Sequence, residues 1–133
     1  MRDPGRAYRT SVVPLSTLFM LGGVFAAVLA WVVRVPITSP FPFIESDDLN
    51  RYLLGIVGLV CVVIGIGLIF RNRVAWYGLL VFLCVGVVLP VISAFDARIV
   101  AMAGFEYPIL GGLLNAVIGI GIYIALRPAF SDV

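Results

Sequence analysis

The amino-acid sequence predicts an all-α, polytopic membrane protein, a bundle of four transmembrane helices in a single membrane domain, residues 1–133. Composition is the first reason: 62% of the residues are hydrophobic and 12% are charged, whereas soluble domains are about half apolar and about a quarter charged. The mean hydropathy of +1.17 agrees. The second reason is that polar breaks divide the chain into four apolar runs. Each is long enough to cross a hydrocarbon core of about 30 Å at about 1.5 Å per residue.

The four predicted helices are bounded by prolines and polar residues. We expect them over residues 14–35, 49–70, 74–95 and 108–126. Pro14 and Pro108 fall in first turns, where a missing N–H costs little, and Pro36 ends the first helix. Pro90 lies inside the third helix and predicts a kink near one membrane face. The first apolar run is longer than a signal-peptide core of about 7–15 residues, so we expect a retained helix.

The connections predict helix neighbours and one helix cap. Residues 71–73 form so short a connection that the second and third helices must be antiparallel neighbours. The first connection ends at Ser46, Asp47 and Asp48. A capping side chain and negative charge both suit the start of the second helix.

The distribution of arginine predicts the orientation. Six arginines lie in the N-terminal segment, the second connection and the C-terminal tail: Arg2, Arg6, Arg9, Arg71, Arg73 and Arg127. The other two connections hold three: Arg34, Arg51 and Arg98. By the positive-inside rule, both termini are expected in the cytoplasm of a cell whose plasma membrane holds the protein. Aromatic residues at span ends predict two interfacial belts: Trp76 with Tyr123, and Trp31 with Tyr52 and Tyr107.

An internal duplication is suggested by a shift of 54 residues, which places Val63–Gly67 on the identical run Val117–Gly121. The same shift relates residues at span ends: Arg73 with Arg127, Pro36 with Pro90, and Ser39 with Ser93. The repeat units would be residues 20–73 and 74–127. Each unit would be a helical hairpin entering the membrane in the same direction. This predicts a parallel repeat about an axis along the membrane normal.

Small residues inside the spans are the main candidates for helix contact. Gly58 and Gly65 lie on one face of the second helix, and Gly112 and Gly119 repeat this spacing in the fourth. Helices in lipid associate through close packing, which small residues permit. These faces would pack the four helices together, or contact another copy or another subunit. Asn115, a strongly polar residue at mid-membrane, would form an interhelical hydrogen bond or line a polar pathway.

Groups at the span ends allow two interpretations each. Five acids in the first and third connections would form surface ion pairs or a cation-binding rim: Glu45, Asp47, Asp48, Asp96 and Glu106. Arg71 and Arg73 would contact anionic lipid head groups, or reflect only the positive-inside bias. Residues 99–107 are too apolar for an ordinary loop and too few to span. They predict an interfacial cover of the bundle that could dock a partner.

The sequence contains no pattern typical of catalysis. It has no His, and Cys61 and Cys84 lie separately in apolar runs. We therefore expect no enzyme activity, no cofactor and no metal site. The net charge of +2 gives no indication of a nucleic-acid partner. All nine basic residues are arginine, which is typical of a GC-rich prokaryotic genome.

Helix–helix association is the leading functional hypothesis. The protein would be a non-enzymatic integral membrane protein, acting as an accessory subunit of a membrane complex or as a homo-oligomeric scaffold. Its partners would be the lipid bilayer and other membrane subunits or copies of itself. The alternative is a small oligomeric channel or facilitator for a small solute or ion, because small polar groups and backbone carbonyls can line a pore.

Overall fold

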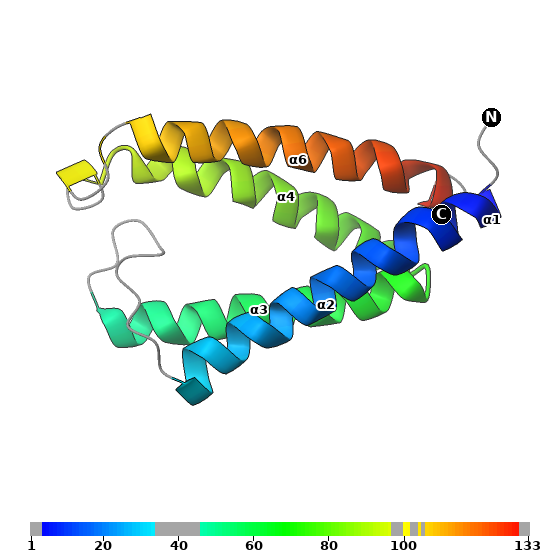
Figure 1. Ribbon diagram of the computed structural model, residues 1–133, viewed down its shortest axis with the longest axis horizontal. Helices are drawn as coiled ribbons and strands as arrows, with labels where there is room; N and C mark the ends of the chain where they lie inside the picture. The colour runs from blue at the N-terminus through cyan, green and yellow to red at the C-terminus, as the bar shows by residue number, and fades with distance from the viewer. Residues whose placement is uncertain (1–3, 34–45, 97–99, 102–103, 105, 131–133) are drawn as a thin grey trace.

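Four long apolar helices follow one another along the chain. The computed structural model describes residues 4–33, 46–96, 100–101, 104 and 106–130. Regular structure in these residues is entirely helical. Within these residues, four helices are long and apolar enough to cross a membrane: Tyr8–Val33, Asp48–Ile69, Arg73–Ser93 and Pro108–Phe130. The predicted all-α class with four such helices is confirmed (Figure 1), and it indicates a multi-pass membrane protein.

The first helix begins at Pro4 and not, as predicted, at Pro14. It is a continuous series of four segments: α1 (Pro4–Ala7), η1 (Tyr8–Val12), α2 (Val13–Ala27) and η2 (Val28–Val33). Both η segments are π-helical. In an α-helix the ring of Pro14 would collide with the carbonyl of Thr10. The wider π turn immediately before Pro14 relieves this crowding, so the proline does not mark the helix start.

The other three helices are α3 (Asp47–Ile69), α4 (Arg73–Ser93) and α6 (Glu106–Phe130). The predicted cap of α3 is present, because Ser46 Oγ accepts a hydrogen bond from the backbone N–H of Leu49 at 3.3 Å. Asn72 Oδ1 caps α4 in the same way, accepting from Val74 N–H at 2.8 Å. Between these helices Arg71 adopts a left-handed φ of 53°, which closes the short turn.

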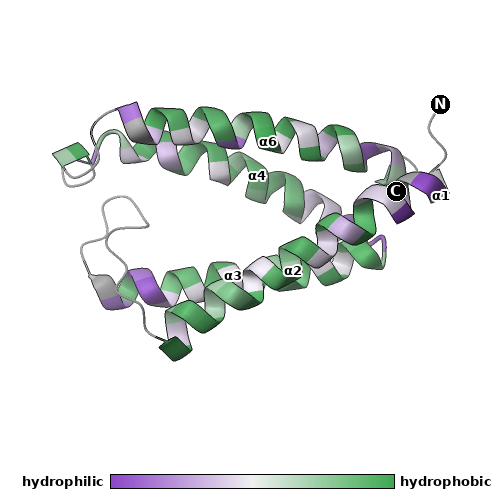
Figure 2. Ribbon diagram, in the orientation of Figure 1, coloured by the Kyte–Doolittle hydropathy of each residue, from purple (hydrophilic) through white to green (hydrophobic). Residues whose placement is uncertain are grey.

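Two helical hairpins make up the molecule. α2 packs against α3, and α4 packs against α6. The hairpins meet at the end of the molecule where both termini and the α3–α4 turn lie, and they separate toward the other end (Figure 1). We call the end at which the hairpins are separated the open end. Apolar residues make up most of each of the four helices, and hydrophilic residues concentrate at the helix ends (Figure 2).

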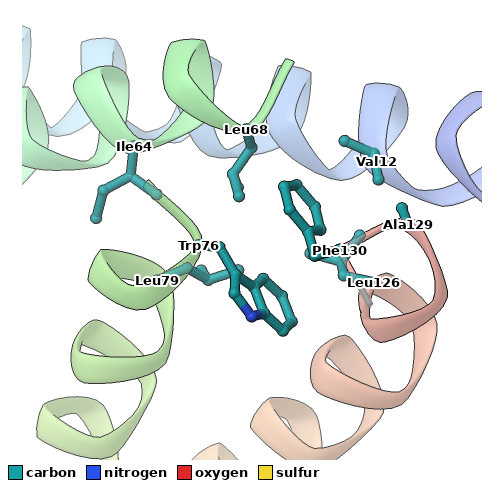
Figure 3. Close-up of a cluster of buried hydrophobic side chains, with 8 residues drawn as sticks. All are labelled: Val12, Ile64, Leu68, Trp76, Leu79, Leu126, Ala129 and Phe130. Atoms are coloured by element: carbon teal, nitrogen blue, oxygen red, sulfur yellow. The ribbon is translucent and has the colours of Figure 1, made fainter. Parts of the chain in front are cut away.

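A buried cluster joins the hairpins at the end where the termini meet (Figure 3). We call this set the terminal cluster: Val12, Ile64, Leu68, Trp76, Leu79, Leu126, Ala129 and Phe130. The Trp76 ring stacks on Phe130 with centroids 4.9 Å apart. Arg71 Nη2 donates to the carbonyl of Ala129 at 2.8 Å, and the Tyr8 hydroxyl donates to the carbonyl of Ile69. All four long helices are therefore tied together here.

The terminal cluster also explains why α6 passes the predicted end at residue 126. Ala129 is 0% exposed and Phe130 is 3% exposed, so the last helical turn is held by packing. Arg71 supplies a donor to one of the carbonyls that a helix end leaves unpaired. Both contacts come from residues far away in the chain, and the helix continues through Pro128 to reach them.

Candidate functional site

The predicted glycine pair of α3 lies against α2. A Cβ atom at Gly58 would lie 2.5 Å from the carbonyl oxygen of Gly23 and 3.0 Å from the backbone nitrogen of Ala27. A Cβ atom at Gly65 would lie 2.9 Å from the carbonyl oxygen of Ser16. These distances are shorter than ordinary van der Waals contact, so the two backbones touch because the side chains are absent.

The second glycine pair lies against α4. A Cβ atom at Gly112 would lie 3.0 Å from Val91 Cγ2 and 3.4 Å from the carbonyl oxygen of Val87. At Gly119 the nearest atom would be Leu83 Cβ at 3.8 Å, an ordinary contact. Gly112 and Gly119 therefore occupy the α4–α6 packing surface, as Gly58 and Gly65 occupy the α2–α3 surface. All four predicted glycines lie within the hairpins.

Asn115 forms an interhelical hydrogen bond. Its Nδ2 donates to the carbonyl of Gly86 in α4 at 2.7 Å, although the residue is exposed at the surface of the chain. A carbonyl already bonded within a helix has a second lone pair, which the amide can use. Such bonds inside membranes are worth about 0.6 kcal/mol on average.

Beyond the terminal cluster the two hairpins enclose an apolar cleft between α3 and α4. Its volume is about 660 Å³. Its walls are α3 from Ile56 to Gly67 and α4 from Val74 to Leu89, with Asn72 at the closed end. Every lining residue except Asn72 is apolar. Because the hairpins diverge, these two helix faces contact each other at the closed end, where Ala75 lies against Gly67, and are uncovered at Gly86.

The α4 wall of the cleft contains small residues that the sequence predictions did not single out. Ala75, Gly78 and Gly86 all line it. Among the described residues, a Cβ atom at Gly78 would meet only Ile64 side-chain atoms, the nearer at 3.7 Å, and one at Gly86 would meet no atom within 4 Å. The helical spacing of these residues was visible in the sequence. That Ala75 and Gly78 lie against α3 while Gly86 faces a space was not visible, because it depends on the divergence of the hairpins.

The predicted head-group arginines both contact protein groups. Arg71 donates to the carbonyl of Ala129, as described above. Arg73 Nη2 lies 3.4 Å from the Tyr77 hydroxyl oxygen, and its guanidinium stands 5.6 Å from the Tyr77 ring centroid. Both residues remain exposed, so contact with lipid phosphate stays a prediction. Arg127 at the end of α6 stands 5.9 Å from the Tyr123 ring centroid.

At the open end, Asp48 forms an ion pair with Arg51 at 3.4 Å, and Asp96 is buried. Glu106 is exposed in the first turn of α6. Trp31 and Tyr52 lie together, with ring centroids 6.1 Å apart. The remaining groups predicted for this end lie outside the described residues, namely Arg34, Glu45, Arg98, the side chains of Asp47 and Tyr107, and residues 99, 102, 103 and 105.

Two fully buried polar residues were not predicted. Asn50 in α3 and Ser16 in α2 are each 0% exposed. Ser16 faces the α3 backbone at Gly65, and its hydroxyl oxygen has no hydrogen-bond partner among the described residues. Nothing in their sequence positions separates them from surface serines and asparagines near helix ends. No group of three His, Cys, Asp or Glu side chains within the described part of the chain could hold a metal ion.

Comparison of the chain with protein-family models, with curated proteins and with solved structures finds no match.

Proposed function

We propose that this protein is non-enzymatic and acts through helix–helix association within the cell membrane, as an accessory subunit of a membrane complex or as a homo-oligomeric scaffold. The observation that carries the proposal is the uncovered cleft between α3 and α4, with its volume of about 660 Å³. Water does not drive helices together inside a bilayer. Association there depends on close packing, and helix faces with small residues permit the closest approach.

The α4 face of the cleft meets this requirement. At Gly86 no described residue approaches within 4 Å of the position of a Cβ atom, and Gly78 has only ordinary contacts. A ridge of side chains from another helix can therefore reach the α4 backbone. By contrast, Gly58 and Gly65 are already used between α2 and α3, so they support the hairpin and not an external contact.

The lining of the cleft favours association over the alternative, a channel. An ion or polar solute needs oxygen or charged groups along its path, and the cleft offers only Asn72 at its closed end. Asn115 is exposed, but its amide nitrogen already donates to Gly86. A pore would have to be assembled from surfaces of several copies.

A matched pair of substitutions tests the proposal. Gly86→Leu fills the cleft without meeting a neighbour near the added Cβ, so the chain should fold while association weakens. Gly121→Leu is the control, because Gly121 is exposed on α6 and its Cβ position is equally empty. Förster transfer between labelled copies in liposomes reports self-association. Recovery of membrane subunits with the tagged chain from its own membranes reports hetero-association.

We expect Gly86→Leu to weaken one of these two readouts about tenfold, which corresponds to about 1.4 kcal/mol of lost packing. Gly121→Leu should leave both unchanged. The proposal is wrong if the wild-type chain is monomeric in liposomes and recovers no subunit, or if the two variants behave alike.

Plasma-membrane location with both termini in the cytoplasm belongs to the same proposal. It is supported by the location of most arginines at one end of the molecule. Arg6, Arg9, Arg71, Arg73 and Arg127 all belong to segments at the end where the termini lie. The positive-inside rule places such an end in the cytoplasm.

A further inference from the structure

A small pocket at the open end lies apart from the cleft. Its volume is about 270 Å³, and its lining residues are Ala30, Trp31, Asp48, Arg51 and Tyr52. The first two belong to η2, at the end of the first span, and the other three to the start of α3. The spans that contain these segments are Tyr8–Val33 and Asp48–Ile69. The pocket therefore lies where two spans end, at the depth of lipid head groups.

The pocket contains the guanidinium of Arg51, whose hydrogen-bond donors are only partly paired. Arg51 Nη1 lies 3.4 Å from Asp48 Oδ1, which is a long contact for a charged pair. Arg51 Nε is buried and has no acceptor among the described residues. A guanidinium presents donors on two edges, and a phosphate or carboxylate commonly binds one edge through two parallel hydrogen bonds. Asp48 engages Nη1 of Arg51, and no described residue accepts from Nε; because Nε is buried, an anion reaches this edge when the guanidinium turns toward the pocket.

Opposite charge and aromatic faces stand beside this cation. The Asp48 side chain is 93% exposed, whereas that of Arg51 is 22% exposed. The Trp31 and Tyr52 rings lie 6.1 Å apart and are tilted by 35°. Trp31 is held in place because its indole ring lies directly on Gly55, where a Cβ atom would overlap it. Aromatic faces attract ammonium groups, and Trp and Tyr favour the membrane interface.

We propose that this pocket binds the head group of a zwitterionic phospholipid. The phosphodiester accepts hydrogen bonds from Arg51, and the ammonium group lies between the Asp48 carboxylate and the Trp31 and Tyr52 rings. The adjacent carboxylate disfavours an anionic head group, which would bring a second negative charge to the same place. The inference is independent of the proposed function, because the pocket and the cleft share no lining residue.

Native mass spectrometry of the full chain in detergent tests the proposal. The probes are phosphatidylethanolamine, phosphatidylglycerol and the soluble head group glycerophosphoethanolamine. We expect one phosphatidylethanolamine to be retained in preference to phosphatidylglycerol. Arg51→Gln should weaken its retention about tenfold, the size expected for one charge-assisted hydrogen bond. Arg51→Lys should weaken it less, because the charge remains while the planar fork is lost. Asp48→Asn should remove the preference between the two lipids.

Arg9→Gln is the matched control, because it removes the same charge at the opposite end of the molecule. It should leave retention unchanged. Helical circular dichroism and elution volume establish whether each variant folds. If Arg51→Gln does not fold, the retention of phosphatidylethanolamine by Arg51→Lys tests the proposal in its place. Equal retention by wild type and folded Arg51 variants overturns the proposal, as does equal retention of the two lipids by wild type. If the soluble head group displaces the lipid at equal concentration, the site recognises a free phosphoester and the lipid assignment is wrong.

Discussion

Adding a single methyl group to the glycines of the helix contacts should have a graded effect on stability. At Gly58 the new Cβ atom would lie 2.5 Å from Gly23 O and 3.0 Å from Ala27 N. Both are backbone atoms, and relief requires α2 to move away from α3. Overpacking of this kind costs about 1–3 kcal/mol. We therefore expect Gly58→Ala to lower the free energy of unfolding by an amount in that range.

The other glycines rank below Gly58 for structural reasons. Gly65→Ala meets a backbone oxygen of Ser16 at 2.9 Å and should cost nearly as much. Gly112→Ala meets a side-chain methyl of Val91 at 3.0 Å, and this exposed side chain can rotate. Gly119→Ala meets its nearest atom at 3.8 Å and should be neutral. The two glycine pairs related by 54 residues should therefore differ in their sensitivity.

Gly22→Ala is the control, because its Cβ position has no neighbour within 4 Å in the part of the chain that the structure describes. Replacing Gly by Ala in a helix interior favours the helix by up to about 1 kcal/mol in water, so the control should be neutral or stabilising. Unfolding by sodium dodecyl sulfate in mixed micelles, followed by tryptophan fluorescence, measures the differences. If Gly58→Ala unfolds at the same detergent fraction as Gly22→Ala, the close approach of α2 and α3 is refuted.

Three further predictions follow from single contacts. Asn115→Leu removes the hydrogen bond to Gly86 and should lower the free energy of unfolding by about 0.6–1.7 kcal/mol in the same assay. If the wild-type chain carries solute flux in liposomes and Asn115→Leu abolishes it, the result supports the channel instead. Arg71→Gln removes the bond to Ala129 and should speed carboxypeptidase trimming of the C-terminus without changing the first hairpin. A thiol placed at Asn72 in a cysteine-free chain should be labelled from inside the cell only, and labelling from outside would reverse the proposed orientation.

Helix number and most helix limits could be predicted because the signals are local. The α3 start at Asp47 follows from Ser46, and the α4 start at Arg73 follows from Asn72, both capping side chains. Each limit lies within two residues of its prediction. The predicted start of the first helix at Pro14 was wrong. A proline in the first turn of a helix and a proline that follows a π-helical turn within a helix cannot be distinguished in the sequence.

The site could not be predicted in the same way, because it depends on contacts between distant segments. In the sequence, Gly58 and Gly86 are both glycines within apolar runs, and the pattern around them does not distinguish them. One touches the backbone of α2 and the other faces an open cleft. Which of them is free depends on how far the hairpins diverge, and the hairpins contact each other through the terminal cluster at the other end of the molecule. Periodicity identifies a helix face and does not identify what that face meets.

The suggested duplication takes a more specific form once contacts are considered. A shift of 54 residues relates Gly58 to Gly112, yet the partners of these glycines do not follow it. Gly58 meets Gly23 and Ala27, whereas Gly112 meets Val87 and Val91, each 64 residues later in the chain. Pro36 lies outside the described residues, so its match with Pro90 gives no structural support. A duplication compatible with the contacts therefore needs two shifts, one for each helix of the hairpin, with the difference absorbed in the connection.

The second shift leads to a prediction about function. It relates Gly22 of α2 to Gly86 of α4, and both glycines have an empty Cβ position. In a parallel repeat, a partner that packs on Gly86 in the α3–α4 cleft has a counterpart beside Gly22, between α2 and α6. Gly22→Leu should then weaken association in liposomes as much as Gly86→Leu does, while Gly121→Leu has no effect. If only Gly86→Leu weakens it, the two hairpins are not equivalent in association, and any ancestral symmetry does not extend to the surface that binds the partner.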